Sequence, residues 1–220
     1  MVESYKNKVI IVGCGPGLKA YISPKTLYNI KKADILLGSR RLLKLFPNSD
    51  AKKIIIEKNY KIMLDRIARW RSSMQVVVLV SGDPCFFSYA KMIVKKIGRE
   101  SCIIIPGISS MQLAFAAIGE CWDDASFISL HGRNTGYERL IRKVRNNCTV
   151  GILTDNKNTP AIIASRLLGG GIRDRRMFVC ESLSLPEERI REMDLTSAVH
   201  IIKTNSPTVV IIKDTRNEDR

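Results

Sequence analysis

The segment Val76-Val77-Val78-Leu79-Val80-Ser81-Gly82-Asp83-Pro84 is the most informative part of this 220-residue chain. Its first five residues are all apolar, without the polar alternation of a half-exposed strand. An unbroken run of this kind predicts a strand that is buried on both faces, as in the middle of a parallel sheet. The Ser-Gly-Asp-Pro sequence that follows predicts a loop that opens a helix over residues 87–97. The segment therefore predicts a strand–loop–helix unit of an α/β sheet.

The same alternation continues on both sides of this segment. Helical patterns separate the apolar runs, and one of them begins at Ser23-Pro24, where a serine N-cap precedes a proline in the first turn. Strands that alternate with helices are typical of an open, mostly parallel sheet. Four further strands are predicted at residues 9–12, 35–37, 54–56 and 103–105.

A polar segment at residues 120–124 interrupts this pattern and predicts a domain boundary. We expect an N-terminal α/β domain over residues 1–119 and a C-terminal α/β domain over residues 120–220. The C-terminal domain is predicted to contain a mixed rather than an all-parallel sheet, because its last apolar runs have the spacing of hairpins. These runs lie at residues 178–183, 199–203 and 208–212.

Composition argues against several classes of protein. No apolar run approaches the ~18–20 residues of a transmembrane helix, and the amino terminus lacks the apolar core of a signal peptide. We therefore expect a soluble cytoplasmic protein. The six cysteines never lie within three residues of one another, and His131 and His200 are 69 residues apart. This spacing predicts no metal site held by the protein.

The net charge of +15 is concentrated in the first half of the chain. Residues 1–110 hold 20 basic and 7 acidic residues, whereas residues 111–220 hold 16 and 14. A basic surface of this kind fits a polyanion, either a nucleic acid or a small molecule with several carboxylates. A solvated basic face without a ligand is the alternative.

Three loops follow predicted strands at their carboxyl ends, where open α/β sheets bind ligands. They are Gly13–Gly17, Ser81–Pro84 and Pro106–Ser110. A dinucleotide site is excluded, because Leu18 occupies the position of the third glycine and Asp34 precedes the second strand instead of ending it. The alternative to a ligand site is that the glycines only form turns and that Asp83 only caps the next helix.

Together, these three loops resemble the ordered signatures of the tetrapyrrole (precorrin) methylases, and the resemblance covers residues 8–213. Within that family, residues 33–43, 81–88 and 127–133 are similar to the branch that methylates carbon 5 of cobalt-precorrin-6B in anaerobic cobalamin biosynthesis. The resemblance implies two α/β domains with S-adenosyl-L-methionine in the inter-domain cleft, usually as a homodimer. Any cobalt would arrive with the substrate.

The resemblance also assigns residues to the cofactor and to the substrate. The residues implied at the cofactor are Pro16, Gly82, Asp83, Phe86, Ser109, Ser110, Leu153, Thr154, Pro207 and Thr208. Cationic or hydrogen-bonding side chains that suit a polycarboxylated tetrapyrrole are Arg40, Arg41, His131 and Arg133. Cys14 and Cys85 depart from the expected loop residues but leave the turns possible. No catalytic residue is assigned, because the ring carbon is itself the nucleophile and the protein mainly positions it.

Two other functions remain open from sequence. Relatives with this fold methylate ribosomal RNA, and a basic binding module without catalysis would also explain the charge. Because the chain ends at Arg220 without a second module, we expect hand-over of the product to a separate decarboxylating methyltransferase.

Overall fold

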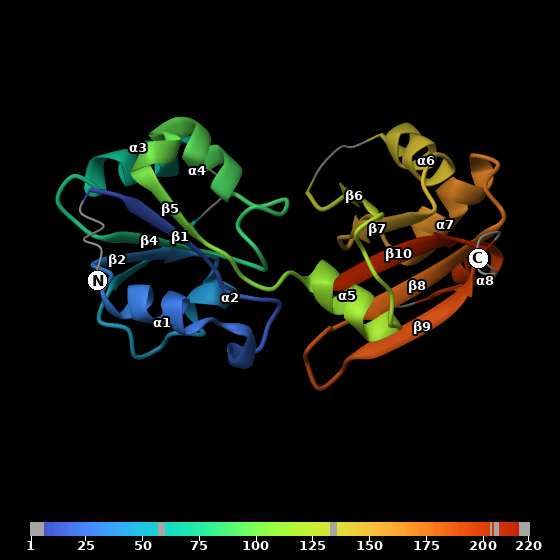
Figure 1. Cartoon of the computed structure of the whole chain (residues 1–220), viewed down its shortest axis with the longest axis horizontal. Coiled ribbons are helices and arrows are strands. Elements are labelled where there is room, and N and C mark those ends of the chain that lie inside the picture. Colours follow the sequence, from blue (N-terminus) through green and yellow to red (C-terminus); the bar gives the residue numbers. More distant parts are fainter. Residues whose placement is uncertain (1–6, 57–59, 133–135, 203, 205–206, 216–220) are drawn as a thin grey trace. The chain divides into compact units, whose positions relative to one another are not determined.

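The computed structural model describes residues 7–56, 60–132, 136–202, 204 and 207–215. The chain forms two compact units, Met1–Ser109 and Ser110–Arg220. Each unit has its own five-stranded sheet with helices packed on it (Figure 1). Helix α5 (Ser110–Ile118) belongs to the second unit, so the division falls before this helix rather than after it.

All strand pairs in the first unit are parallel, as the sequence predicted. The strand order is β3-β2-β4-β1-β5, which places β1 and β4 next to each other near the middle. The strands are β1 (Val9–Gly13), β2 (Ile35–Gly38), β3 (Lys52–Ile55), β4 (Val76–Val80) and β5 (Cys102–Ile105).

The unbroken apolar run of β4 is explained by helices on both faces of this sheet. Val77 and Leu79 belong to one buried cluster, and Val76, Val78 and Val80 belong to another. Figure 1 shows helices over both faces of the sheet. These are α1 (Pro24–Lys31) and α2 (Arg40–Leu43) on one side, and α3 (Tyr60–Trp70) and α4 (Ala90–Ile97) on the other.

The second unit contains a mixed sheet with the order β6-β7-β10-β8-β9, as predicted. Only β6 and β7 pair in parallel, and the other neighbours are antiparallel. Its strands are β6 (Ser126–Ser129), β7 (Thr149–Leu153), β8 (Arg175–Glu181), β9 (Arg189–Asp194) and β10 (Thr208–Asp214). Its remaining helices are α6 (Tyr137–Arg145), α7 (Pro160–Gly169) and α8 (Leu195–Ala198). Among the helices described, none is long and apolar enough to cross a bilayer.

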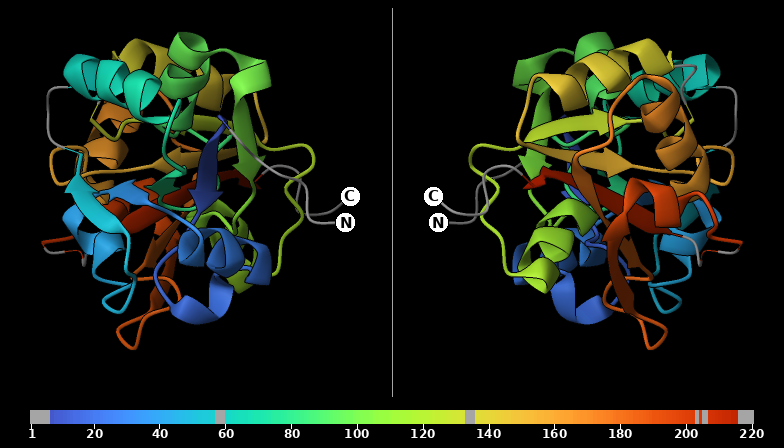
Figure 2. Two further views of the ribbon diagram at one scale, coloured as in Figure 1. Left: turned by 90° about the vertical axis from the view of Figure 1, so that its left-hand side faces the viewer. Right: turned by 90° about the vertical axis from the view of Figure 1, so that its right-hand side faces the viewer.

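The predicted strand at residues 199–203 is wrong. Residues 199–202 form a turn and an irregular segment after α8, and Ile202 is fully exposed. The hairpin partner of β8 is instead β9, whose sequence Arg-Ile-Arg-Glu-Met-Asp carries too much charge to be recognised by hydrophobicity (Figure 2). An edge strand tolerates such a sequence, because one side of its backbone and much of its surface remain in solvent.

A buried ion pair joins two strands of the second unit. Arg175 begins β8 and Asp214 ends β10, and their side chains are only 5% and 8% exposed. Arg175 Nη1 lies 2.7 Å from Asp214 Oδ2, and Arg175 Nη2 donates to the carbonyl of Val144 at 3.2 Å. The carboxylate therefore balances a guanidinium that has little access to water.

We expect Asp214→Ala to lower the free energy of unfolding of the second unit by about 3–5 kcal/mol, because it leaves a buried charge uncompensated. Urea unfolding of a Trp70→Phe protein measures this, because Trp122 then reports the second unit. Glu192→Ala is the control, since it removes an ion pair between Glu192 and Arg176 on the surface. The side chain of Glu192 is 50% exposed and that of Arg176 is 44% exposed. That loss is expected to stay below about 1 kcal/mol. Equal losses in the two variants would contradict the role given to the buried pair.

Candidate functional site

Three loops meet at the carboxyl edge of the first sheet and contact one another through their backbones. The N–H of Cys14 donates to the carbonyl of Val80 at 2.9 Å, and the N–H of Gly82 donates to the carbonyl of Gly15 at 2.9 Å. These bonds join the loop after β1 to the loop after β4. The loop after β5 packs against both.

Two glycines are required by this close approach. A Cβ atom on Gly13 would lie 2.6 Å from the nitrogen of Gly107, and one on Gly107 would lie 2.6 Å from the oxygen of Gly82. Real side chains do not fit at such distances from backbone atoms. A third glycine, Gly82, is required for a different reason. Its φ of +64° lies in the left-handed region, which glycine adopts more readily than residues with a side chain. The glycines therefore hold three loops together in addition to forming turns.

Asp83 ties two of these loops to each other. Its Oδ1 accepts from the N–H of Cys85 at 2.7 Å, and its Oδ2 accepts from the N–H of Gly107 at 3.1 Å. The alternative that Asp83 only caps the next helix is wrong, because α4 begins at Ala90 rather than at residue 87. Its carboxylate instead binds a backbone group 24 residues away in sequence.

The other residues predicted in the first unit lie on or beside these loops. Pro16 and Ser109 are buried, and Phe86 is half-buried with its ring 4.8 Å from that of Phe87. Arg41 Nη2 donates to Ser81 Oγ at 2.8 Å, which brings the first turn of α2 to the end of β4. Arg40 is exposed, and Ser110 begins α5 in the second unit.

Cys14 is a structural residue of the first loop. Burial raises the pKa of its thiol to about 12, although the nearby Arg41 guanidinium acts to lower it. The thiol is therefore protonated at neutral pH. Cys85 lies on the loop after β4 and is largely exposed. Partial burial, and to a smaller extent the negative charge of Asp83, raise the pKa of its thiol as well.

A second group of predicted residues meets at one edge of the sheet in the second unit. His131 follows β6, Thr154 follows β7, and Thr208 begins the antiparallel strand β10. Thr154 Oγ1 donates to the carbonyl of Thr208 at 2.7 Å, and His131 Nδ1 lies 3.1 Å from the carbonyl oxygen of Thr154. Leu153 is the last residue of β7, and Pro207 is exposed just before β10. Arg133 lies outside the described residues.

Asp155 organises this edge and was not singled out by the sequence analysis. Its Oδ2 accepts from the N–H of Gly132 at 2.9 Å, and its Oδ1 accepts from the N–H groups of Lys157 and Asn158. Partial burial acts to raise the pKa of the Asp155 carboxyl, but these hydrogen bonds lower it to about 2. The available signal was the sequence Asp-Asn-Lys-Asn, which is typical of a side chain that binds the backbone two residues later.

Asn158 is the second residue missed at this edge. Its Nδ2 donates to the carbonyl of Leu130 at 3.2 Å and to Asp155 Oδ1 at 2.9 Å. Its Oδ1 accepts from the hydroxyl of Tyr137 at 2.7 Å. Burial raises the pKa of Tyr137, so this hydroxyl keeps its proton and remains a donor. The residues on both sides of His131 are therefore held by hydrogen bonds.

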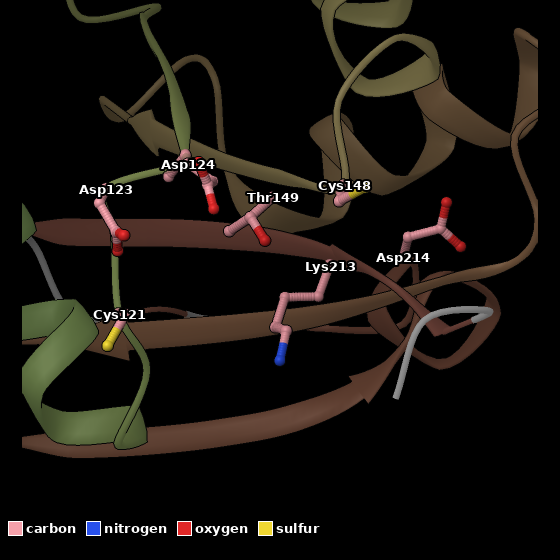
Figure 3. Close-up of a pocket in the computed structure, with 8 residues that line it drawn as sticks. Cys121, Asp123, Asp124, Cys148, Thr149, Lys213 and Asp214 are labelled. Carbon is pink, nitrogen blue, oxygen red and sulfur yellow. The ribbon is translucent and has the colours of Figure 1, made fainter. Parts of the chain in front are cut away.

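A cavity of about 250 Å³ lies in the second unit, at the other ends of strands β7 and β10 (Figure 3). Its lining includes Thr149 at the start of β7 and Asp214 at the end of β10, so it is separate from Thr154 and Thr208. No predicted site residue lines it. Among the residues described, no group of three or more His, Cys, Asp or Glu side chains is arranged to hold a metal ion.

We expect Gly107→Ala to cost about 1–3 kcal/mol of stability, because the new methyl group must displace backbone atoms. Urea unfolding followed by circular dichroism measures this cost. Gly169→Ala is the control, since its Cβ atom would meet nothing within 4 Å at the end of α7. A Gly107→Ala protein as stable as the control would show that the three loops are not tightly packed.

We expect Asp155→Asn to destabilise the protein most at neutral pH. The folded carboxyl has a pKa of about 2, below its ordinary value of 3.8, so the unfolded chain binds the proton more tightly. The stabilisation is therefore complete above the unfolded pKa and is lost as the pH falls through the folded pKa. Urea unfolding of both proteins from about pH 7 to about pH 3 should show their difference shrinking.

Asp123→Asn is the control, because this side chain is exposed and its substitution is expected to change the free energy of unfolding at neutral pH by less than about 0.5 kcal/mol. A stability difference between wild type and Asp155→Asn that grows on acidification would contradict the proposed hydrogen bonds.

The sequence matches the family of tetrapyrrole (corrin/porphyrin) methylases over residues 8–199. It is 33% identical over 187 residues to a probable cobalt-precorrin-7 C(5)-methyltransferase of Methanocaldococcus jannaschii, covering 83% of this chain and 87% of the relative. It is 32% identical over 206 residues to the cobalt-precorrin-7 C(5)-methyltransferase of Salmonella typhimurium, covering 94% and 98%.

The fold is similar to that of a solved uroporphyrin-III C-methyl transferase from Thermus thermophilus in complex with S-adenyl homocysteine. The TM-score is 0.76 at 22% identity, over 94% of this chain and 97% of that one. The family match includes the three loops of the first unit, and the two relatives each extend over most of the sequence. This chain therefore belongs to the tetrapyrrole (corrin/porphyrin) methylase family.

Proposed function

We propose that this chain is an S-adenosyl-L-methionine-dependent methyltransferase that acts on ring carbon 5 of a cobalt-precorrin in anaerobic cobalamin biosynthesis. The sequence favoured cobalt-precorrin-6B as this substrate, and cobalt-precorrin-7, which the names of both relatives carry, is the other candidate. The observation that carries the proposal is the similarity to the Salmonella typhimurium C(5)-methyltransferase over 94% of this chain. The fold supports it, because the related Thermus thermophilus structure holds S-adenyl homocysteine.

The loops of the first unit offer the polar and apolar groups that S-adenosyl-L-methionine could contact. Their glycines leave peptide groups without side chains, and Phe86 and Ile108 add partly exposed apolar surface beside them. We assign Gly82, Phe86 and Ser109 to direct contact with the cofactor. Asp83 holds the loops in place, because both of its oxygens already accept backbone N–H groups. When bound, the cofactor supplies an electrophilic methyl group on a sulfonium sulfur.

The second unit contributes the edge formed by β6, β7 and β10. We assign Leu153, Thr154, Pro207 and Thr208 to the adenine side of the cofactor, following the family resemblance. The bond from Thr154 Oγ1 to the Thr208 carbonyl keeps the two strand ends together. Ser110 and Pro16 complete the proposed cofactor residues.

The substrate carries several carboxylates, which fits a basic protein with a net charge of +15. A guanidinium pairs with a carboxylate through two parallel hydrogen bonds, so Arg40, Arg41 and Arg133 are assigned to these groups. Arg41 is the best positioned of the described pair, because Ser81 already holds it at the end of β4.

The cellular setting follows from the proposed reaction. We propose a cytoplasmic homodimer that receives cobalt already bound in the substrate and hands the methylated product to a separate decarboxylating methyltransferase. Methylation of ribosomal RNA and non-catalytic binding are less well supported, because the relatives at 33% and 32% identity described above are named as C(5)-methyltransferases.

Calorimetry with S-adenosylhomocysteine tests cofactor binding. Incubation with S-adenosyl-L-methionine and, in separate reactions, cobalt-precorrin-6B or cobalt-precorrin-7 then tests methyl transfer. We expect saturable cofactor binding and a product whose mass shows one methyl group in place of one hydrogen. Asp83→Ala should weaken S-adenosylhomocysteine binding by about tenfold or more, because the loss of a charge-assisted hydrogen bond of ~1.5–3 kcal/mol frees the loops.

Salt-sensitive binding of RNA without binding of the tetrapyrrole would instead favour the RNA methyltransferase. A wild-type protein that binds no S-adenosylhomocysteine would support the non-catalytic module.

A further inference from the structure

We propose that His131 Nε2 is the general base that removes the proton from the methylated ring carbon. This inference rests on the proposed function, because it concerns the same reaction. A bridging ring carbon that carries one hydrogen must lose it if a methyl group is to take its place.

The hydrogen bond to Thr154 determines which nitrogen of His131 is available. A carbonyl oxygen only accepts, so the contact of 3.1 Å between Nδ1 and the Thr154 oxygen places a proton on Nδ1. In the neutral ring, Nε2 then carries the lone pair. His131 is exposed, so this lone pair is not enclosed in the core.

The imidazole is held in place from several directions. Asn158 binds the carbonyl of Leu130 before it, and Asp155 binds the N–H of Gly132 after it. Thr154, which accepts from Nδ1, is itself bound to Thr208 on β10. A base that is fixed in this way needs little reorganisation when the proton moves.

The neighbouring carboxylates are committed to other partners. Both oxygens of Asp155 accept N–H groups, and these bonds keep its pKa near 2. Glu181 at the end of β8 is buried and paired with Arg191, whose Nη2 lies 2.8 Å from Glu181 Oε2. The imidazole Nε2, in contrast, keeps its lone pair in the tautomer that the bond to Thr154 selects, and imidazole is the group that most often acts as a general base in enzymes.

The proposed step is a simple proton transfer. After methyl transfer, the ring carbon bears both the new methyl group and its original hydrogen, and the macrocycle carries one additional positive charge. The C–H bond breaks, its electron pair returns to the π system of the ring, and the proton moves to Nε2. The resulting imidazolium passes the proton to water, which restores the neutral base.

His131→Asn isolates this role, because the Asn amide nitrogen can replace Nδ1 as the donor to Thr154 while no base remains. We expect kcat to fall by about 100-fold or more, because the proton then has no base to receive it. KM for cobalt-precorrin-6B and the Kd for S-adenosylhomocysteine should each change less than about threefold, since the base acts only after the substrate is bound. In His131→Ala, added imidazole should restore part of kcat. His200→Asn is the matched control, and its turnover should equal that of the wild-type protein.

The outcomes separate this inference from the proposed function. Unimpaired turnover by His131→Asn, in a preparation where the wild-type protein methylates, would overturn the inference alone. A higher KM with unchanged kcat would also overturn it and would restore His131 as a substrate contact. No methyl transfer by the wild-type protein would overturn the proposed function and the inference together.

Discussion

The candidate site of the first unit depends on the contact between the backbones of Gly13, Gly82 and Gly107. Three strand ends approach so closely that a single Cβ atom would lie 2.6 Å from a neighbouring backbone atom. Backbone atoms, rather than side chains, therefore make the contact between the three loops. The turn at Gly82, with its φ of +64°, and the contact of Arg41 with Ser81 belong to the same loop after β4.

An aspartate serves the same purpose in each unit. Asp83 follows β4 and binds the N–H of Gly107 in the adjacent loop, while Asp155 follows β7 and binds the N–H of Gly132. In both cases one carboxylate oxygen also binds the backbone two residues later. A carboxylate can accept several N–H groups at once, so it fixes its own turn and a neighbouring loop together. These two aspartates are therefore positioning residues.

The net charge of the chain does not by itself identify the ligand, and the family decides between the two candidates. A net charge of +15 suits a nucleic acid and a polycarboxylated macrocycle equally well. Membership in the tetrapyrrole methylases favours the macrocycle, and the arginines of α2 then become candidates for its carboxylates. Arg41 donates to Ser81 Oγ, and this bond places its guanidinium at the strand ends, which makes it the stronger candidate of the two.

The sequence by itself determined the buried strands, the parallel first sheet and the three loops, because continuous apolar runs and glycine turns are local signals. It also identified Ser23 as the N-cap of α1. The charged edge strand β9, the partner of Asp83 and the role of Asp155 were decided only by the tertiary structure. Asp83 and Asp155 each bind N–H groups more than 20 residues away, and β9 is stabilised by pairing with β8. Such long-range pairing leaves no periodic pattern in the sequence, since it depends on which chain segments the fold brings together.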